Sequence, residues 1–176
     1  MTKALAKRKA TKQAPAKKAA RKTSVSKTTR LFTIGYQQTT PKAVLDELEN
    51  AGVKLLIDVR AVAASRRPGF SKRQLSAGLN ERGIGYLHFQ ALGTPTEGRL
   101  AARSGDQKAL TSIYAKQLKT QHAKHEIAEL NSLIETAGPV CILCYERDHR
   151  ECHRRFIAEI IEERGVTIEN LLAPQL

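Results

Sequence analysis

The sequence has no apolar run that approaches the length of a membrane span, and no continuous apolar segment near its start resembles a signal peptide. We therefore expect neither a membrane protein nor a membrane partner. Cysteine is scarce: there are three, all between Cys141 and Cys152. An odd number in one cluster argues against a disulfide framework and is typical of a reducing compartment, so we expect a cytoplasmic protein.

Acidic residues are missing from the first 30 positions, which hold eleven Lys or Arg. The rest of the chain then has 19 basic residues against 17 acidic ones, so most of the formal net charge of +13 belongs to this segment. The segment also lacks aromatic residues, and it cannot bury enough apolar surface to offset the entropy lost on ordering. We predict a disordered, Lys/Ala-rich basic tail over residues 1–30 and a single globular domain over residues 31–176.

A tail of this composition favours non-specific contact with nucleic acid, because each Lys or Arg that neutralises a phosphate releases a counterion. The alternative interpretation is a solubilising extension. The tail residues that we expect to contact phosphates are Lys7, Arg8, Lys9, Lys17, Lys18, Arg21 and Lys22.

Beyond the tail, short apolar segments alternate with segments of helical periodicity. Strands are predicted over residues 31–36, 54–60, 84–89 and 139–146, and a last short one over 167–172. Helices are predicted over residues 41–52, 71–83 and 149–165, and two more within 106–137. Strands separated by helices predict an α/β fold, a three-layer domain with a mainly parallel sheet flanked by helices. In such sheets ligands bind beyond the carboxyl ends of the strands.

The stretch "CILCYERDHRECHRR", residues 141–155, is the richest in reactive side chains. Its CxxC pair looks like a metal or redox motif. In a strand, however, Cys141 and Cys144 point to opposite faces and cannot act together. We expect Cys141 in the core and Cys144 on the same face as Glu146.

A zinc site in this stretch could use Cys144, His149, Cys152 and His153. Their spacing matches none of the usual paired-ligand patterns, so we predict no metal site. Free cysteine is among the most buried residue types, which favours Cys152 as part of the buried stripe of the last helix. Asp148 and Glu151 have the spacing of a capping box at the start of that helix.

A nucleophilic cysteine is the other reactive possibility, since Cys144 and Arg150 have the Cys-x5-Arg spacing of phosphate-loop phosphatases. The intervening loop "YERDH" has no glycine with which to form a nest of backbone N–H groups. It also places two carboxylates, those of Glu146 and Asp148, where a phosphate would bind. The sequence therefore disfavours this reaction.

A second polar stretch, "DVRAVAASRRPGFSK", covers residues 58–72. Asp58 and Arg60 are predicted to leave a strand end on one face, and the following loop contributes Ser65, Arg66 and Arg67. Guanidinium groups bind phosphate and carboxylate groups bidentately, so an anion site is one interpretation. An internal ion-pair network is the other, and one constellation could serve both purposes.

Four segments, "TIGYQ", "DVR…SRRPGFSK", "GIGYLHFQALGTP" and "LCYERDHRECHR", resemble the domain-of-unknown-function family DUF488. The likeness runs from about Thr33 to Ile160, and its most specific element is Cys-x-Glu-x5-Cys-His-Arg. The family usually has a proline where this chain has Ala63, so the loop after Arg60 is expected to be less rigid. The resemblance implies that the polar residues form a shared site, but it supplies no reaction.

We therefore expect an uncharacterised α/β domain that acts as an enzyme or ligand-binding protein on an anionic substrate, a nucleotide or nucleic acid. The alternative is a non-enzymatic nucleic-acid-associated or protein-interaction module, since no complete set of nucleophile, base and oxyanion donors is evident. Any cofactor is left open. The expected catalytic residues are Asp58, Cys144, Glu146 and His153, and the expected anion-binding residues are Arg60, Ser65, Arg66 and Arg154.

Overall fold

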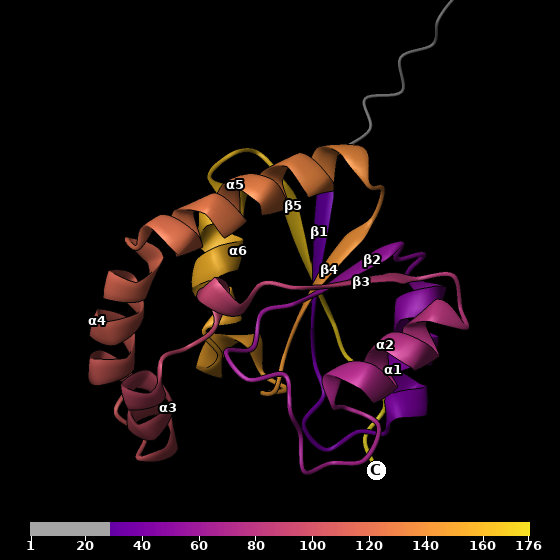
Figure 1. Ribbon diagram of the computed structural model, residues 1–176, viewed down its shortest axis with the longest axis horizontal. Coiled ribbons are helices and arrows are strands. Elements are labelled where there is room, and N and C mark those ends of the chain that lie inside the picture. The colour runs from indigo at the N-terminus through magenta and orange to yellow at the C-terminus, as the bar shows by residue number, and fades with distance from the viewer. Residues whose placement is uncertain (1–28) are drawn as a thin grey trace, which may run out of the picture.

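A five-stranded parallel sheet lies at the centre of the described part of the chain, residues 29–176 of the computed structural model (Figure 1). The strands, in the order β3-β2-β4-β1-β5, are β1 (Arg30–Gly35), β2 (Leu55–Asp58), β3 (Gly85–His88), β4 (Val140–Cys144) and β5 (Thr167–Leu171). Every neighbouring pair is parallel, which confirms the predicted sheet. The predicted disorder of the basic tail falls on residues that lie, except for the last two, outside the described residues.

Helices cover both faces of this sheet, so the three-layer α/β fold is confirmed. One face packs on side chains of α1 and α2, and the other on side chains of α4, α5 and α6. The helices are α1 (Pro41–Asn50), α2 (Lys72–Asn80), α3 (Thr96–Arg103), α4 (Gln107–Leu118), α5 (Gln121–Thr136) and α6 (Arg154–Glu162), with 3₁₀ turns η1 (Gln90–Leu92) and η2 (His149–Glu151).

The central strand β4 is buried along its whole length. Its side chains alternate: Cys141 packs with the α1 and α2 side chains, whereas Cys144 packs with those of α5 and α6. This alternation confirms that the two ends of the CxxC motif lie on opposite faces of the sheet.

The last predicted helix, residues 149–165, is wrong as a single element. Cys152 has extended backbone angles (φ −112°, ψ 145°), which separate η2 from α6. Asp148 caps the short turn η2, where its side chain accepts a hydrogen bond from the Arg150 N–H, rather than the α-helix. Because the chain turns at Cys152, the side chains of Cys152 and of the next residue, His153, both approach the end of β4.

Helix α3 was not among the predicted elements, although it lies between two segments that were. It begins after Pro95, and its only buried residue is Gly98, so it has almost no apolar stripe to reveal it. Across residues 29–176, no helix has both the length and the apolar character needed to cross a membrane.

Candidate functional site

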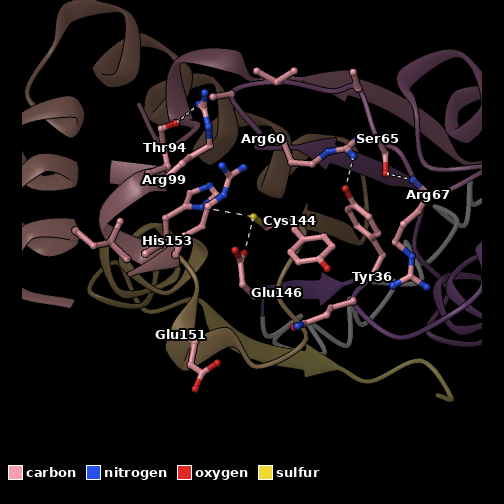
Figure 2. A pocket seen from close by; sticks show the side chains of 18 of the residues that line it. Tyr36, Arg60, Ser65, Arg67, Thr94, Arg99, Cys144, Glu146, Glu151 and His153 are labelled. Atoms are coloured by element: carbon pink, nitrogen blue, oxygen red, sulfur yellow. Dashed lines mark hydrogen bonds between the residues drawn. The ribbon is translucent and has the colours of Figure 1, made fainter. Parts of the chain in front are cut away.

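A cleft of about 830 Å³ opens at the carboxyl ends of β1, β2 and β4 (Figure 2). The loop that follows β2 forms one wall and contributes Ser65 and Arg66. Helix α3 and the start of α4 form the opposite wall. Cys144, Glu146 and His153 lie between them, at the end of β4 and the start of α6. The cleft thus has the position that parallel α/β sheets provide for ligands.

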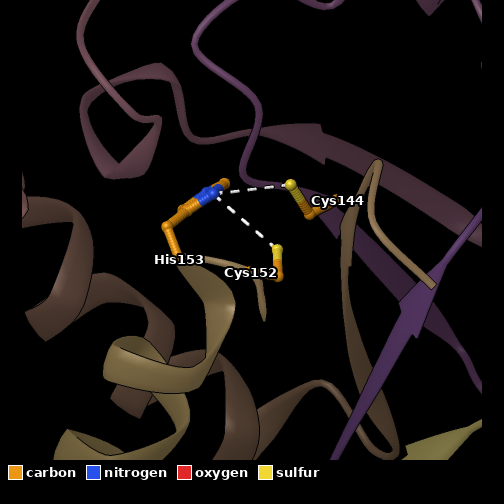
Figure 3. A group of neighbouring side chains, drawn as sticks. All are labelled: Cys144, Cys152 and His153. Carbon is orange, nitrogen blue, oxygen red and sulfur yellow. Dashed lines mark hydrogen bonds between the residues drawn. The ribbon is translucent and has the colours of Figure 1, made fainter. Parts of the chain in front are cut away.

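Two thiols and one imidazole gather beside the cleft (Figure 3). The Nδ1 atom of His153 lies 3.4 Å from the Cys144 sulfur and 3.8 Å from the Cys152 sulfur. Its Nε2 atom lies 2.9 Å from the backbone oxygen of Val59. Since a carbonyl oxygen only accepts, Nε2 carries a proton, and Nδ1 is the nitrogen that faces the two sulfurs.

The pKa values of the acidic groups in and beside this cluster shift in different directions. Burial opposes its ionisation, but a hydrogen bond from Cys144 and the neighbouring His153 outweigh that effect, so the pKa of Cys152 lies well below its ordinary value. Burial and the same hydrogen bond hold the pKa of Cys144 well above its ordinary value. Burial, and then the charge on Cys152, raise the pKa of Glu146 to about 7. The Cys144 sulfur also lies 3.3 Å from Glu146 Oε2, so its single proton has an acceptor on either side, Cys152 or Glu146.

Asp58, one of the expected catalytic residues, does not line the cleft. Its carboxylate is completely buried and accepts hydrogen bonds from Arg60 Nε at 2.8 Å, from Arg60 Nη2 at 2.5 Å and from the Tyr86 hydroxyl at 2.8 Å. Asp58 pairs in register with Leu143, so it leaves the sheet on the face opposite to Cys144. The expectation that Asp58 and Cys144 share one crevice is therefore wrong.

Arg60 does reach the cleft, but its guanidinium is already occupied. Besides the two bonds to Asp58, Nη1 donates to the Tyr36 hydroxyl at 2.8 Å and to the Phe70 backbone oxygen at 3.0 Å. Of the two interpretations that the sequence left open for Arg60, the geometry matches the internal ion-pair network.

Arg154 lies outside the cleft and anchors the loop that carries Glu146. Its buried guanidinium donates to the Thr33 hydroxyl at 3.2 Å and to the backbone oxygens of Glu146 and Arg147. Gly35 makes this close approach possible, since a Cβ atom there would lie 1.8 Å from the Glu146 oxygen. Arg154 therefore positions Glu146 and is not placed to contact a ligand in the cleft.

Four other arginines line the cleft, and within residues 29–176 none has a carboxylate partner at ion-pair distance. Arg67 and Arg99 donate to backbone oxygens, those of Thr39 at 2.6 Å and Thr94 at 2.8 Å. The Arg66 and Arg103 side chains are exposed and make no hydrogen bond in this part of the chain. The four arginines are Arg66, Arg67, Arg99 and Arg103.

Sequence reasoning placed Ser65, Arg66 and Arg67 in the loop at this site but missed Arg99 and Arg103. Ser65 accepts a hydrogen bond from the Arg67 N–H at 3.1 Å, which fixes the bend of the loop. Arg99 and Arg103 are four residues apart, a spacing that places them on one side of a helix. That spacing is a usable signal only once helix α3 is recognised.

The two reactive motifs considered from the sequence differ in outcome. Arg150 pairs with Asp148 at 2.7 Å and does not line the cleft, so it is not opposed to Cys144 as a phosphatase loop requires. Of the four residues considered as zinc ligands, His149 does not line the cleft either, whereas Cys144, Cys152 and His153 have ligand atoms within 4.8 Å of one another.

The family model described as "Domain of unknown function DUF488" matches residues 40–161, more than half of the chain. The chain therefore belongs to this family, as its motifs indicated. No curated protein and no solved structure matches it.

Proposed function

We propose that this member of the DUF488 family is an enzyme that acts on a phosphate-bearing substrate, a nucleotide or a nucleic acid, bound in the cleft. The observation that supports this is the group of four arginines on the two walls, none of which has a carboxylate partner within residues 29–176. Like charges that face one gap repel each other. An anionic ligand would relieve that repulsion and accept bidentate hydrogen bonds.

The arginines act from both sides of the substrate in this proposal. Arg66 contacts it from the loop after β2, while Arg99 and Arg103 contact it from α3. Two carboxylates line the same cleft, and they differ in direction: Glu151 is turned away from Cys144, whereas Glu146 lies beside it (Figure 2). Glu146 is thus the carboxylate placed to exchange a proton with a bound substrate.

The remaining expected residues take supporting roles. Asp58 fixes the side chain of Arg60. Arg154 fixes the loop that carries Glu146. Both residues therefore position the site from outside the cleft. His153 has its Nε2 committed to Val59, so it acts on the two sulfurs rather than on the substrate.

The decisive variant is the double substitution Arg66→Ala, Arg103→Ala. We expect it to weaken binding of a nucleoside triphosphate, or of pyrophosphate, by at least about tenfold, because each charge-assisted hydrogen bond contributes about 1.5–3 kcal/mol. The melting temperature should change little, since neither side chain has a partner to lose in the described part of the chain. Calorimetric titration with both ligands and with a short single-stranded oligonucleotide measures the effect.

The matched control is Arg73→Ala, which removes one exposed arginine of α2 that does not line the cleft. It should leave the affinity unchanged apart from a small effect of net charge. Equal affinities in the parent, the control and the double variant would refute the proposal, as would a parent protein that binds none of the three ligands.

A second function, association with nucleic acid through residues 1–28, is favoured by their ten basic and no acidic side chains. Because β1 begins at Arg30, residues 1–28 can be removed without shortening the sheet. The deletion is expected to remove most of the affinity for duplex DNA or RNA of arbitrary sequence and to flatten its dependence on salt. Filter binding at several salt concentrations measures both. If the truncated protein binds as tightly at equal salt, the basic segment is not the binding element.

A further inference from the structure

We propose that Cys144, Cys152 and His153 bind one zinc ion, with the fourth coordination position facing the cleft. The sequence led to the opposite expectation, because the spacing of these residues fits no usual motif. The backbone geometry at Cys152 explains how such residues can form a site despite their spacing. Its extended conformation turns the consecutive side chains of Cys152 and His153 toward the end of β4. Metal binding itself does not depend on the proposed substrate.

The distances within the cluster suit tetrahedral zinc. With Zn–S at about 2.3 Å and Zn–N at about 2.0–2.1 Å, a tetrahedral angle separates sulfur and nitrogen by about 3.6 Å. The Nδ1 atom of His153 lies 3.4 Å from one sulfur and 3.8 Å from the other. A hydrogen bond between an imidazole and a thiol would bring one sulfur close to the nitrogen. Here the Nδ1 atom of His153 faces two sulfurs at similar distances.

The surroundings of the imidazole also suit a metal ligand. Metal-binding histidines usually donate their second ring N–H to a carbonyl or carboxylate, which fixes the ring and the tautomer. The 2.9 Å contact between His153 Nε2 and the Val59 oxygen has that arrangement and leaves Nδ1 for the metal. Val59 follows β2 directly, and its N–H donates to Leu143 of β4, so the acceptor is held rigidly beside the cluster.

Burial and charge favour an ion with two positive charges. The three side chains are 4%, 1% and 6% exposed, so the cluster is nearly dry. Two thiolates and one Zn²⁺ together carry no net charge, which is the form that a dry site tolerates best. Thiolate and imidazole ligands select zinc over magnesium or calcium, which prefer oxygen.

Three protein ligands leave a fourth position, as in catalytic zinc sites. Cys144 and His153 line the cleft, so this position opens toward it, and the Glu146 carboxylate lies 3.3 Å from the Cys144 sulfur on the same side. Glu146 or a ligand from the cleft completes the shell. A zinc-bound water there would be an activated nucleophile for the substrate. This last role, unlike the binding of zinc, rests on the proposed function.

The test uses the full chain, purified under reducing conditions with any affinity tag removed. Elemental analysis is expected to find about one zinc per chain. Cys152→Ser and His153→Ala should each lose most of it. The matched control is Cys141→Ser, a fully buried cysteine of the same motif that packs on the opposite face of the sheet, which should keep its zinc.

Cobalt gives a second readout that does not require the variants to fold. Removing zinc with a chelator and titrating Co²⁺ into the parent protein should produce the intense visible bands of tetrahedral Co²⁺ and a thiolate-to-metal charge-transfer band. A folded parent that contains no zinc and gives no such bands would overturn the proposal. Full zinc content in folded Cys152→Ser would overturn it as well.

The zinc proposal and the substrate proposal fail separately. The variant Arg66→Ala, Arg103→Ala touches none of the three ligands, so it should retain zinc while losing phosphate ligands. Zinc in a parent protein that binds no anion would leave the metal site standing and refute the proposed function. Anion binding by a parent protein that contains no zinc and gives no cobalt bands would support the proposed function and refute the zinc site.

Discussion

Asp58→Ala is expected to lower the free energy of unfolding by about 3–5 kcal/mol. The carboxylate and the Arg60 guanidinium are 0% and 6% exposed, and two parallel hydrogen bonds join them. Removing the carboxylate leaves Arg60 buried with no counter-charge, and it also removes the acceptor of the Tyr86 hydroxyl. The loss comes mainly from the unpaired arginine and not from the strength of the pair.

Denaturant unfolding measures this loss, and Glu169→Ala is the matched control. Glu169 also pairs with an arginine, Arg30, at 3.1 Å, but both side chains are about half exposed. Exposed pairs of this kind contribute about 0–1 kcal/mol. The double variant Asp58→Ala, Arg60→Leu should recover part of the stability that Asp58→Ala loses, since it leaves no buried charge. A loss no larger than that of Glu169→Ala would show that Arg60 does not depend on Asp58.

Gly35→Ala is the second substitution with a large expected effect. The new Cβ atom would lie 1.8 Å from the backbone oxygen and 2.6 Å from the backbone carbon of Glu146, with the Arg154 guanidinium at 2.9 Å. Neither backbone atom can move without displacing the loop. We expect a loss of about 3 kcal/mol or more, at the upper end of overpacking effects. Ligand binding should weaken too, because Glu146 moves with its loop.

Gly52→Ala serves as the control for Gly35→Ala, because no atom lies within 4 Å of its added Cβ. Its backbone is left-handed (φ +70°), so alanine there should cost about 1–2 kcal/mol through conformational strain alone. Thermal and denaturant unfolding of both variants separate collision from strain. Equal losses would mean that the loop after β4 yields easily and does not fix Glu146.

The sheet and its layers could be predicted because the spacing of apolar residues within one segment indicates which face of that strand or helix is buried. The apolar run of β4 placed it at the centre of the sheet, and strand alternation separated Cys141 from Cys144 correctly. The register between strands is not a local property. Asp58 leaves the sheet away from Cys144 because it pairs with Leu143, and no pattern within either strand encodes that pairing.

The site was predictable where it follows a strand end and unpredictable where it depends on a turn. Glu146 and Arg66 lie at the cleft because both follow strands whose carboxyl ends meet. Cys152 seemed to belong to the buried stripe of a helix because apolar spacing continues across it, and a single extended residue leaves no trace in that spacing. Arg99 and Arg103 belong to a short helix in which Gly98 is the only buried residue, so no buried apolar stripe marks it in the sequence.

The direction of β1 has a consequence for how the basic segment and the cleft could share one substrate. Residues 1–28 join the domain at the amino end of β1, whereas the cleft opens at the carboxyl end, a strand of six residues or about 20 Å away. A fully extended chain of 28 residues, the length of this segment, reaches no more than about 100 Å from its attachment point. A nucleic acid held by the segment would be tethered near the domain at high local concentration. Since that reach exceeds the distance to the cleft, a short strand could already contact the segment and the cleft at once, and a longer strand, with more phosphates for the segment, would gain more affinity.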